Sequence, residues 1–110
     1  MKITFKHKEL EQLANNDKLR LKMMGKNRAV RFKLRLTQLY AADTLHDVKD
    51  LPGNYHELVG DLKGKWACDL DQPYRLIFTP HEDPIPTDPN GKYIWLEIHG
   101  VEILEIKDYH

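Results

Sequence analysis

The stretch KWACDLDQPYRLIFT, residues 65–79, decides the fold class of this 110-residue chain. Its two apolar runs, residues 65–70 and 74–79, flank a break of three residues, Asp71-Gln72-Pro73. Aromatic and β-branched residues on both sides of so short a break predict two antiparallel strands joined by a hairpin loop. Residues 101–107 alternate apolar and polar side chains over most of their length, which predicts a further strand.

Upstream of this hairpin the pattern changes from strand to helix. Residues 2–6 alternate apolar and polar side chains and predict one strand at the start of the chain. From residue 8 the apolar residues recur at helical spacing, and they predict two helices separated at residues 15–17, the second interrupted at Gly25. The order predicts an α+β fold, in which an N-terminal strand and two helices pack on a small, mainly antiparallel sheet as one domain, residues 1–110.

The second helix is predicted to be amphipathic. At about 100° per residue its apolar side chains share a face that we expect to pack on the core, namely Ala29, Phe32, Leu36, Leu39 and Tyr40. Three arginines, Arg28, Arg31 and Arg35, fall along one margin of that face. We expect them to form a cationic stripe on the helix surface.

The formal net charge of zero conceals a polarised chain. Residues 1–40 carry a net charge of +8, and residues 41–110 carry a net charge of −8. This split favours a positive surface that meets something anionic, either nucleic acid or an acidic partner protein. It is equally compatible with two solvated faces that pair with each other on folding.

Several classes of protein are excluded by composition. No apolar run approaches the roughly 20 residues that a membrane span requires, and residues 1–10 lack the apolar core of a signal peptide, so we expect a cytoplasmic protein with no membrane partner. With Cys68 alone no internal disulfide is possible, and Cys68 is expected to be a small buried residue. The six histidines show no metal-ligand spacing and there is no glycine-rich phosphate loop, so neither a metal nor a small-molecule cofactor is expected.

Three segments, in this order, carry a resemblance to a known family. They are P-G-x-x-H-x-L-x-G-D-x-K-G-x-W at residues 52–66, the aromatic-Arg-x-x-Phe strand at residues 74–78, and I-x-D-Y-H at residues 106–110. Together they resemble the HigB branch of the RelE/ParE superfamily of type II toxins, over nearly the whole chain. The resemblance implies a RelE-like fold and a ribosome-dependent endoribonuclease (mRNA interferase) that inhibits translation. It also implies two partners, mRNA on the ribosome and a cognate helix-turn-helix antitoxin.

Metal-independent RNA cleavage needs a base for the 2′-OH proton, cations for the charge on the phosphoryl oxygens, and an acid for the departing 5′-oxygen. The resemblance places five residues at the family's functional positions: His56, Arg75, Asp108, Tyr109 and His110. Histidine suits acid and base work because its reference pKa lies near 6.5, whereas arginine stays charged and stabilises negative charge. We therefore expect His56 and His110 to act as general acid and base and Arg75 to stabilise the charge on the phosphoryl oxygens. Asp108 and Tyr109 are expected to position the reacting groups.

One position departs from the family pattern. Where many relatives carry an active-site lysine just before the Gly-Asp pair, this chain has Val59. Either Lys63 or Lys65 supplies the missing cation, or cleavage is slow, or the protein does something else. The RNA-binding residues that we expect are therefore Lys63 and Lys65, together with the stripe of Arg28, Arg31 and Arg35.

Two alternatives to the nuclease remain open at this point. One is a ParE-like inhibitor of DNA gyrase, and the other is a non-catalytic member that only binds an antitoxin or regulates. Residues 79–92, which contain four prolines and Asn90-Gly91, predict an exposed irregular loop of unassigned use. The nuclease hypothesis requires His56, Lys63, Lys65, Arg75 and His110 to converge into a local cationic patch within the acidic part of the chain.

Overall fold

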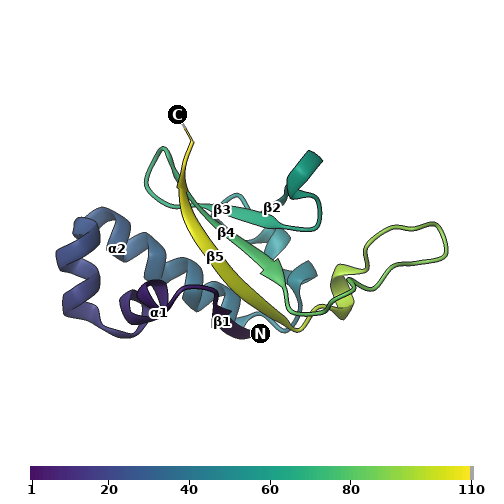
Figure 1. Ribbon diagram of the computed structural model, residues 1–110, viewed down its shortest axis with the longest axis horizontal. Coiled ribbons are helices and arrows are strands. Elements are labelled where there is room, and N and C mark those ends of the chain that lie inside the picture. The colour runs from purple at the N-terminus through teal and green to yellow at the C-terminus, as the bar shows by residue number, and fades with distance from the viewer. Residues whose placement is uncertain (110) are drawn as a thin grey trace.

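The computed structural model describes residues 1–109 and arranges them as two helices against one five-stranded sheet (Figure 1). The strands lie in the order β1-β5-β4-β3-β2. The helices and strands, in chain order, are β1 (Lys2–Phe5), α1 (Lys8–Asn15), α2 (Asp17–Ala41), β2 (His56–Glu57), β3 (Trp66–Asp69), β4 (Tyr74–Pro80) and β5 (Gly100–Asp108). The predicted α+β fold is confirmed.

The predicted hairpin forms the middle of the sheet. β3 and β4 pair antiparallel, with Trp66 opposite Phe78 and Asp69 opposite Arg75. β5 pairs antiparallel with β4 on one side and parallel with β1 on the other, so the last strand lies inside the sheet. A register shift between Ile77 and Phe78 marks a bulge in the β4–β5 ladder.

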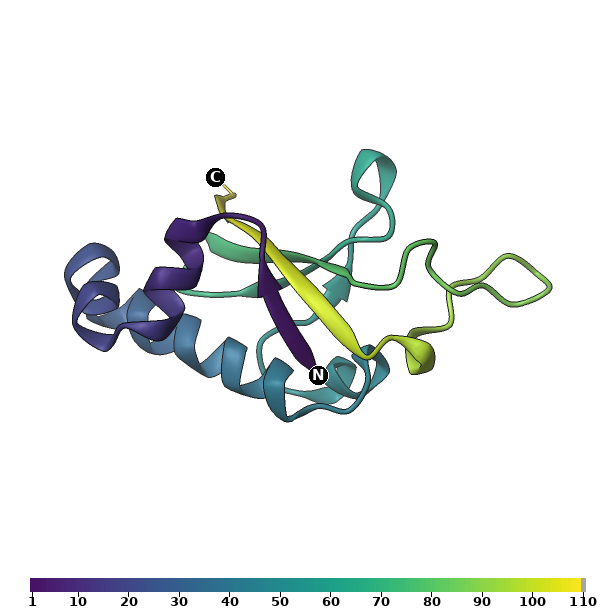
Figure 2. The ribbon, with the colours of Figure 1, turned by 60° about the horizontal axis from the view of Figure 1, so that its bottom comes forward.

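Both helices lie along one side of the sheet (Figure 2). The predicted separation at residues 15–17 is present, because the side chain of Asn16 accepts a hydrogen bond from the Leu19 N–H and caps α2. The predicted interruption is present too: Gly25 has φ 76° and ψ 166° and kinks α2. No helix among residues 1–109 is long and apolar enough to cross a membrane.

The core lies between α2 and the sheet. Phe32 and Leu39 of α2 are fully buried and meet apolar side chains of three strands, including Trp66, Cys68, Leu76, Phe78, Val101 and Ile103. The prediction for Tyr40 is wrong, since it is 74% exposed. Tyr40 lies in the last turn of α2, and the side chain that fills the core there is its neighbour Leu39.

Residues 81–92 form the irregular segment that the prolines predict, beyond the last residue of β4; the predicted start at residue 79 is wrong, because Thr79 and Pro80 still pair with Glu102 and Val101 of β5. Figures 1 and 2 show this segment as an arm that projects away from the sheet. Its turn is held by the Asp88 carboxylate, which accepts hydrogen bonds from the N–H groups of Asn90 and Lys92. The chain then returns to the core through Trp95, whose ring packs edge-on against Trp66 at 5.2 Å.

Candidate active site

The face of the sheet turned away from the helices carries three of the residues singled out by the sequence, His56, Arg75 and Tyr109. Directly paired residues share a face, so the strand register defines rows across it. One row runs His56, Ala67, Ile77 and Glu105, across β2, β3, β4 and β5. The adjacent row runs Asp69, Arg75 and Lys107. We call this surface the open face.

The floor of the open face is apolar. Ala67 is 0% and Ile77 2% exposed, although both belong to the face that α1 and α2 do not cover. The longer side chains of the neighbouring positions therefore close over them. The apolar centre of the open face is therefore covered, and the charged side chains of Asp69, Arg75, Glu105 and Lys107 lie around it.

Arg75 is the centre of the polar rim. Its Nε lies 3.5 Å from Asp69 Oδ1, and its guanidinium carbon lies 4.7 Å from the centroid of the Tyr109 ring. The Tyr109 N–H donates to the Pro73 carbonyl at 3.0 Å, which extends the β4–β5 ladder and fixes the ring beneath the guanidinium. Lys107 contributes a second cation, with its Nζ 5.5 Å from the same ring.

Asp69, which orients Arg75, is itself anchored from the helix layer. Its carbonyl accepts a hydrogen bond from Arg35 Nε at 2.7 Å, and its Oδ2 accepts one from Asn54 Nδ2 at 3.4 Å. Its Oδ1 is buried and accepts no hydrogen bond, so its contact with Arg75 at 3.5 Å is an ion pair rather than a hydrogen bond. Arg35 thus holds the strand that carries Asp69.

This role corrects the prediction for Arg35. The side chain is 6% exposed and also donates to Gln38 Oε1 and to the Pro52 carbonyl. The position of Arg35 explains why a glycine follows Pro52, because a Cβ at residue 53 would lie 2.8 Å from the Arg35 guanidinium carbon. Arg35 is a buried anchor and takes no part in a cationic stripe.

The other two arginines of the predicted stripe also lie on the helix side of the sheet. Arg28 donates to both carboxylate oxygens of Asp71, at 3.0 and 3.3 Å, and stacks on the Tyr74 ring at 3.5 Å. The hydrogen bond to Asp71 is the main reason that the pKa of the Arg28 guanidinium rises above its ordinary value. Arg31 is exposed to solvent, whereas Arg28 ties α2 to the β3–β4 hairpin. The three arginines therefore do not form the predicted cationic stripe.

The His56 ring is held in one orientation. Its Nδ1 lies 2.7 Å from the Asn54 carbonyl oxygen. Because a carbonyl oxygen only accepts, Nδ1 must be the protonated nitrogen, which leaves the Nε2 lone pair of the neutral ring available to take a proton. The turn preceding β2, in which Gly53 has φ 123° and Asn54 φ 55°, places that carbonyl.

The predicted residues do not all converge. His56 and Arg75 share the open face, two strands and two residues apart, which corresponds to roughly 12 Å between Cα atoms. Lys65 directly precedes β3 and is half-buried, whereas Lys63 has its Nζ 5.7 Å from the Tyr93 ring, beside the proline-rich arm. Lys63 therefore belongs to a different part of the surface.

Two of the three C-terminal residues can be placed. Asp108 pairs with Tyr74, whose side chain packs against the core, so strand alternation puts Asp108 on the face opposite Arg75 and Tyr109. The prediction for His110 lies outside the described residues.

Sequence reasoning missed two charged residues of the open face, Glu105 and Lys107. Both lie in the run that predicted β5, but simple alternation from the core positions Val101 and Ile103 would place them on the core face; the bulge in the β4–β5 ladder turns them to the open face. The sequence did not indicate which side chain lies opposite Glu105 or Lys107, because that depends on the register of β5 against β4.

Cys68 is buried, as expected, and burial raises the pKa of its thiol to about 12, which makes it inert at cellular pH.

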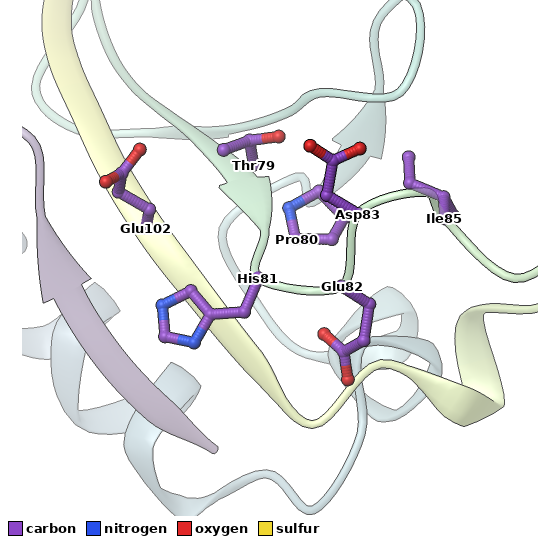
Figure 3. Close-up of a pocket in the computed structure, with 7 residues that line it drawn as sticks. All are labelled: Thr79, Pro80, His81, Glu82, Asp83, Ile85 and Glu102. Atoms are coloured by element: carbon purple, nitrogen blue, oxygen red, sulfur yellow. The ribbon is translucent and has the colours of Figure 1, made fainter.

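A separate cavity of about 360 Å³ lies at the other end of β4 from Arg75 (Figure 3). Its titratable lining residues are three carboxylates and one imidazole: Glu82, Asp83, Glu102 and His81. His81 Nε2 lies 2.6 Å from Thr4 Oγ1, and Glu82 accepts a hydrogen bond from the His99 N–H. An acid-rich cavity repels RNA phosphates, so the end of the open face that carries Arg75 and Lys107 remains the candidate site.

The whole chain is similar in structure to solved bacterial toxins. It matches a chain of the YoeB–YefM complex from Staphylococcus aureus with a TM-score of 0.58 at 15% identity, covering 100% of this chain and 98% of that one. It also matches a YoeB/ParE toxin from Agrobacterium tumefaciens with a TM-score of 0.52 at 12% identity, covering 100% of both chains. No protein-family model and no curated protein sequence matches. The chain therefore has the fold of the YoeB and ParE-type toxins.

Proposed function

We propose that this protein is the toxin of a type II toxin–antitoxin pair, of the HigB kind, and that it cleaves mRNA on the ribosome without a metal ion. The observation that carries the proposal is the arrangement of Arg75 over the Tyr109 ring on the open face, with His56 on the same face. The fold shared with the YoeB and ParE-type toxins supports the toxin role. Inhibition of translation would then take place in the cytoplasm.

In the proposed reaction His56 Nε2 removes the proton from a ribose 2′-OH. The 2′-oxygen attacks the adjacent phosphorus, and negative charge builds on the non-bridging oxygens, where the guanidinium of Arg75 stabilises it. The bond to the 5′-oxygen breaks, and that oxygen takes a proton from the imidazolium of His110. The products are a 2′,3′-cyclic phosphate and a free 5′-OH, so the reaction needs no water and no cofactor.

The proposed regulatory partner is a protein antitoxin. One of the similar structures is a YoeB chain solved as a complex with YefM, which supports such a partner for this fold. The cationic half of the chain, whose net charge is +8 over residues 1–40, favours a partner segment that is acidic.

The test is cleavage of mRNA on programmed ribosomes in a reconstituted translation mixture. We expect the wild-type chain to cut, His56→Ala to lose roughly 10²–10⁴-fold in rate as a proton-transfer residue does, and Arg75→Ala to lose roughly 10²–10³-fold. His46→Ala is the matched control, because His46 is exposed on the turn Leu45–Asp50 that precedes β2.

Three results would count against the proposal. Equal cleavage by the wild type and both site variants would refute the residue assignments. Intact mRNA together with inhibition of gyrase in a supercoiling assay would favour a gyrase inhibitor, and intact mRNA without inhibition would favour a module that only binds its partner.

A further inference from the structure

The open face carries a cation that the sequence did not single out, Lys107. Lys107 pairs directly with Arg75 across the β4–β5 ladder, so both side chains leave the sheet on the same face. Lys107 is exposed, and its Nζ lies 5.5 Å from the centroid of the Tyr109 ring. The same ring carries the Arg75 guanidinium at 4.7 Å. Two cations are thus held beside one aromatic ring.

The charge of this end of the open face depends on Lys107. Arg75 faces the carboxylate of Asp69 at 3.5 Å, and the charges of that pair cancel. Glu105, two residues before Lys107 on the same face, adds a further negative charge. These four side chains together carry no net charge, and without Lys107 their net charge would be −1, so Lys107 is what keeps this end from repelling an anionic ligand.

Of the two lysines expected to replace the one missing at residue 59, Lys63 lies away from Arg75. Val59 is 84% exposed at the start of the turn Gly60–Leu62, and Lys63 lies against Tyr93 at the base of the proline-rich arm. The cation nearest to Arg75 along the strand pairing is instead Lys107, supplied by a different strand.

We propose that Lys107 binds an RNA backbone phosphate next to the scissile one and acts with Arg75 as a two-cation clamp, replacing the lysine that Val59 displaces. The inference rests on the proposed nuclease function. In it the Tyr109 ring keeps both cations on the open face, with the Arg75 guanidinium at the scissile phosphate and the Lys107 ammonium at its neighbour.

The first experiment measures single-turnover cleavage on programmed ribosomes for Lys107→Ala and Lys107→Arg, with Lys92→Ala, an exposed lysine of the arm, as control. We expect Lys107→Ala to cut about 10²-fold more slowly, Lys107→Arg to recover most of that loss because it restores the charge, and Lys92→Ala to cut at the wild-type rate. Lys107→Ala cutting at the wild-type rate, or Lys107→Arg being as slow as Lys107→Ala, overturns the proposal.

The second experiment does not depend on cleavage. A fluorescent single-stranded RNA with every 2′-OH methylated cannot be cut, and its affinity is measured against salt concentration by anisotropy. Loss of one phosphate contact lowers the slope of log affinity against log salt by about 0.7, which is the result expected for Lys107→Ala and not for Lys92→Ala. Equal slopes for the wild type and Lys107→Ala, or no measurable affinity of the wild type for the RNA, overturn the clamp. Failure of the proposed nuclease function is distinguished from this, because the wild type would then be inactive in the first experiment.

Discussion

Replacement of Gly53 by alanine should destabilise the fold far more than replacement of Gly60, although both glycines have positive φ. At Gly60, with φ 65°, a Cβ meets nothing within 4 Å, so only the backbone penalty of about 1–2 kcal/mol applies. At Gly53, with φ 123°, the Cβ would lie 2.8 Å from the Arg35 guanidinium carbon and Nε. The guanidinium must move, and it is buried.

The extra cost follows from the hydrogen bonds that Arg35 would lose. Its shortest bond, from Nε to the Asp69 carbonyl, measures 2.7 Å, and a hydrogen bond from a charged donor contributes about 1.5–3 kcal/mol. Gly53→Ala should therefore cost about 2.5–5 kcal/mol in all, a large part of the roughly 5–15 kcal/mol that stabilises a typical domain.

The assay is urea denaturation followed by circular dichroism, with the midpoint compared at unchanged m value. In an Arg35→Ala background the guanidinium is absent, so the cost of Gly53→Ala should fall by the hydrogen-bond contribution of about 1.5–3 kcal/mol and leave only the backbone penalty. If Gly53→Ala costs the same with and without Arg35, the steric argument is wrong and the glycine serves the backbone alone.

Three further predictions follow from the contacts around the site. Arg28→Ala should lower the free energy of unfolding by about 1–2 kcal/mol, less in high salt, because the bond to Asp71 is only partly buried; a thermal melt at two salt concentrations checks it, and an unchanged melting temperature would contradict it. Iodoacetamide should modify Cys68 only as fast as the chain unfolds, since its thiol is buried with a raised pKa, and rapid labelling of the native protein by mass spectrometry would contradict this. Asp69→Asn should keep the fold but slow RNA cleavage by about tenfold, since it removes the charge that orients Arg75; a rate equal to the wild type would show that the ring contact alone suffices.

The parts of the fold that the sequence predicted are those with local causes. The β3–β4 hairpin follows from two apolar runs around a three-residue break, and the kink at Gly25 follows from a glycine within a helical pattern. Arg35 was misjudged because helical projection gives the direction of a side chain and not the length of its reach. The Arg35 guanidinium does not extend into solvent, because it donates hydrogen bonds to the carbonyls of Pro52 and Asp69, which lie 17 and 34 residues away in the chain.

The candidate site was predicted in its types of residue and only partly in its geometry. The pairing of Lys107 with Arg75 depends on the register of β5 against β4, and that register shifts at the bulge between Ile77 and Phe78. The adjacent apolar residues Ile103 and Leu104 mark the change of phase in β5, but they do not indicate which residues of β4 lie opposite Glu105 and Lys107. The proximity of Lys107 to Tyr109 could have been read from strand alternation, because the two are separated by one residue.

The position of β5 inside the sheet has a consequence for a nascent chain. β5 is the last strand in chain order, yet it separates β1 from β4, so a polypeptide synthesised only as far as residue 99 has two strand edges with no neighbour. Arg75 is then made, but the strand that carries Lys107 and leads to Tyr109 is not. The proposed nuclease therefore stays incomplete until β5 has been synthesised, and the ribosome that makes it is spared until then.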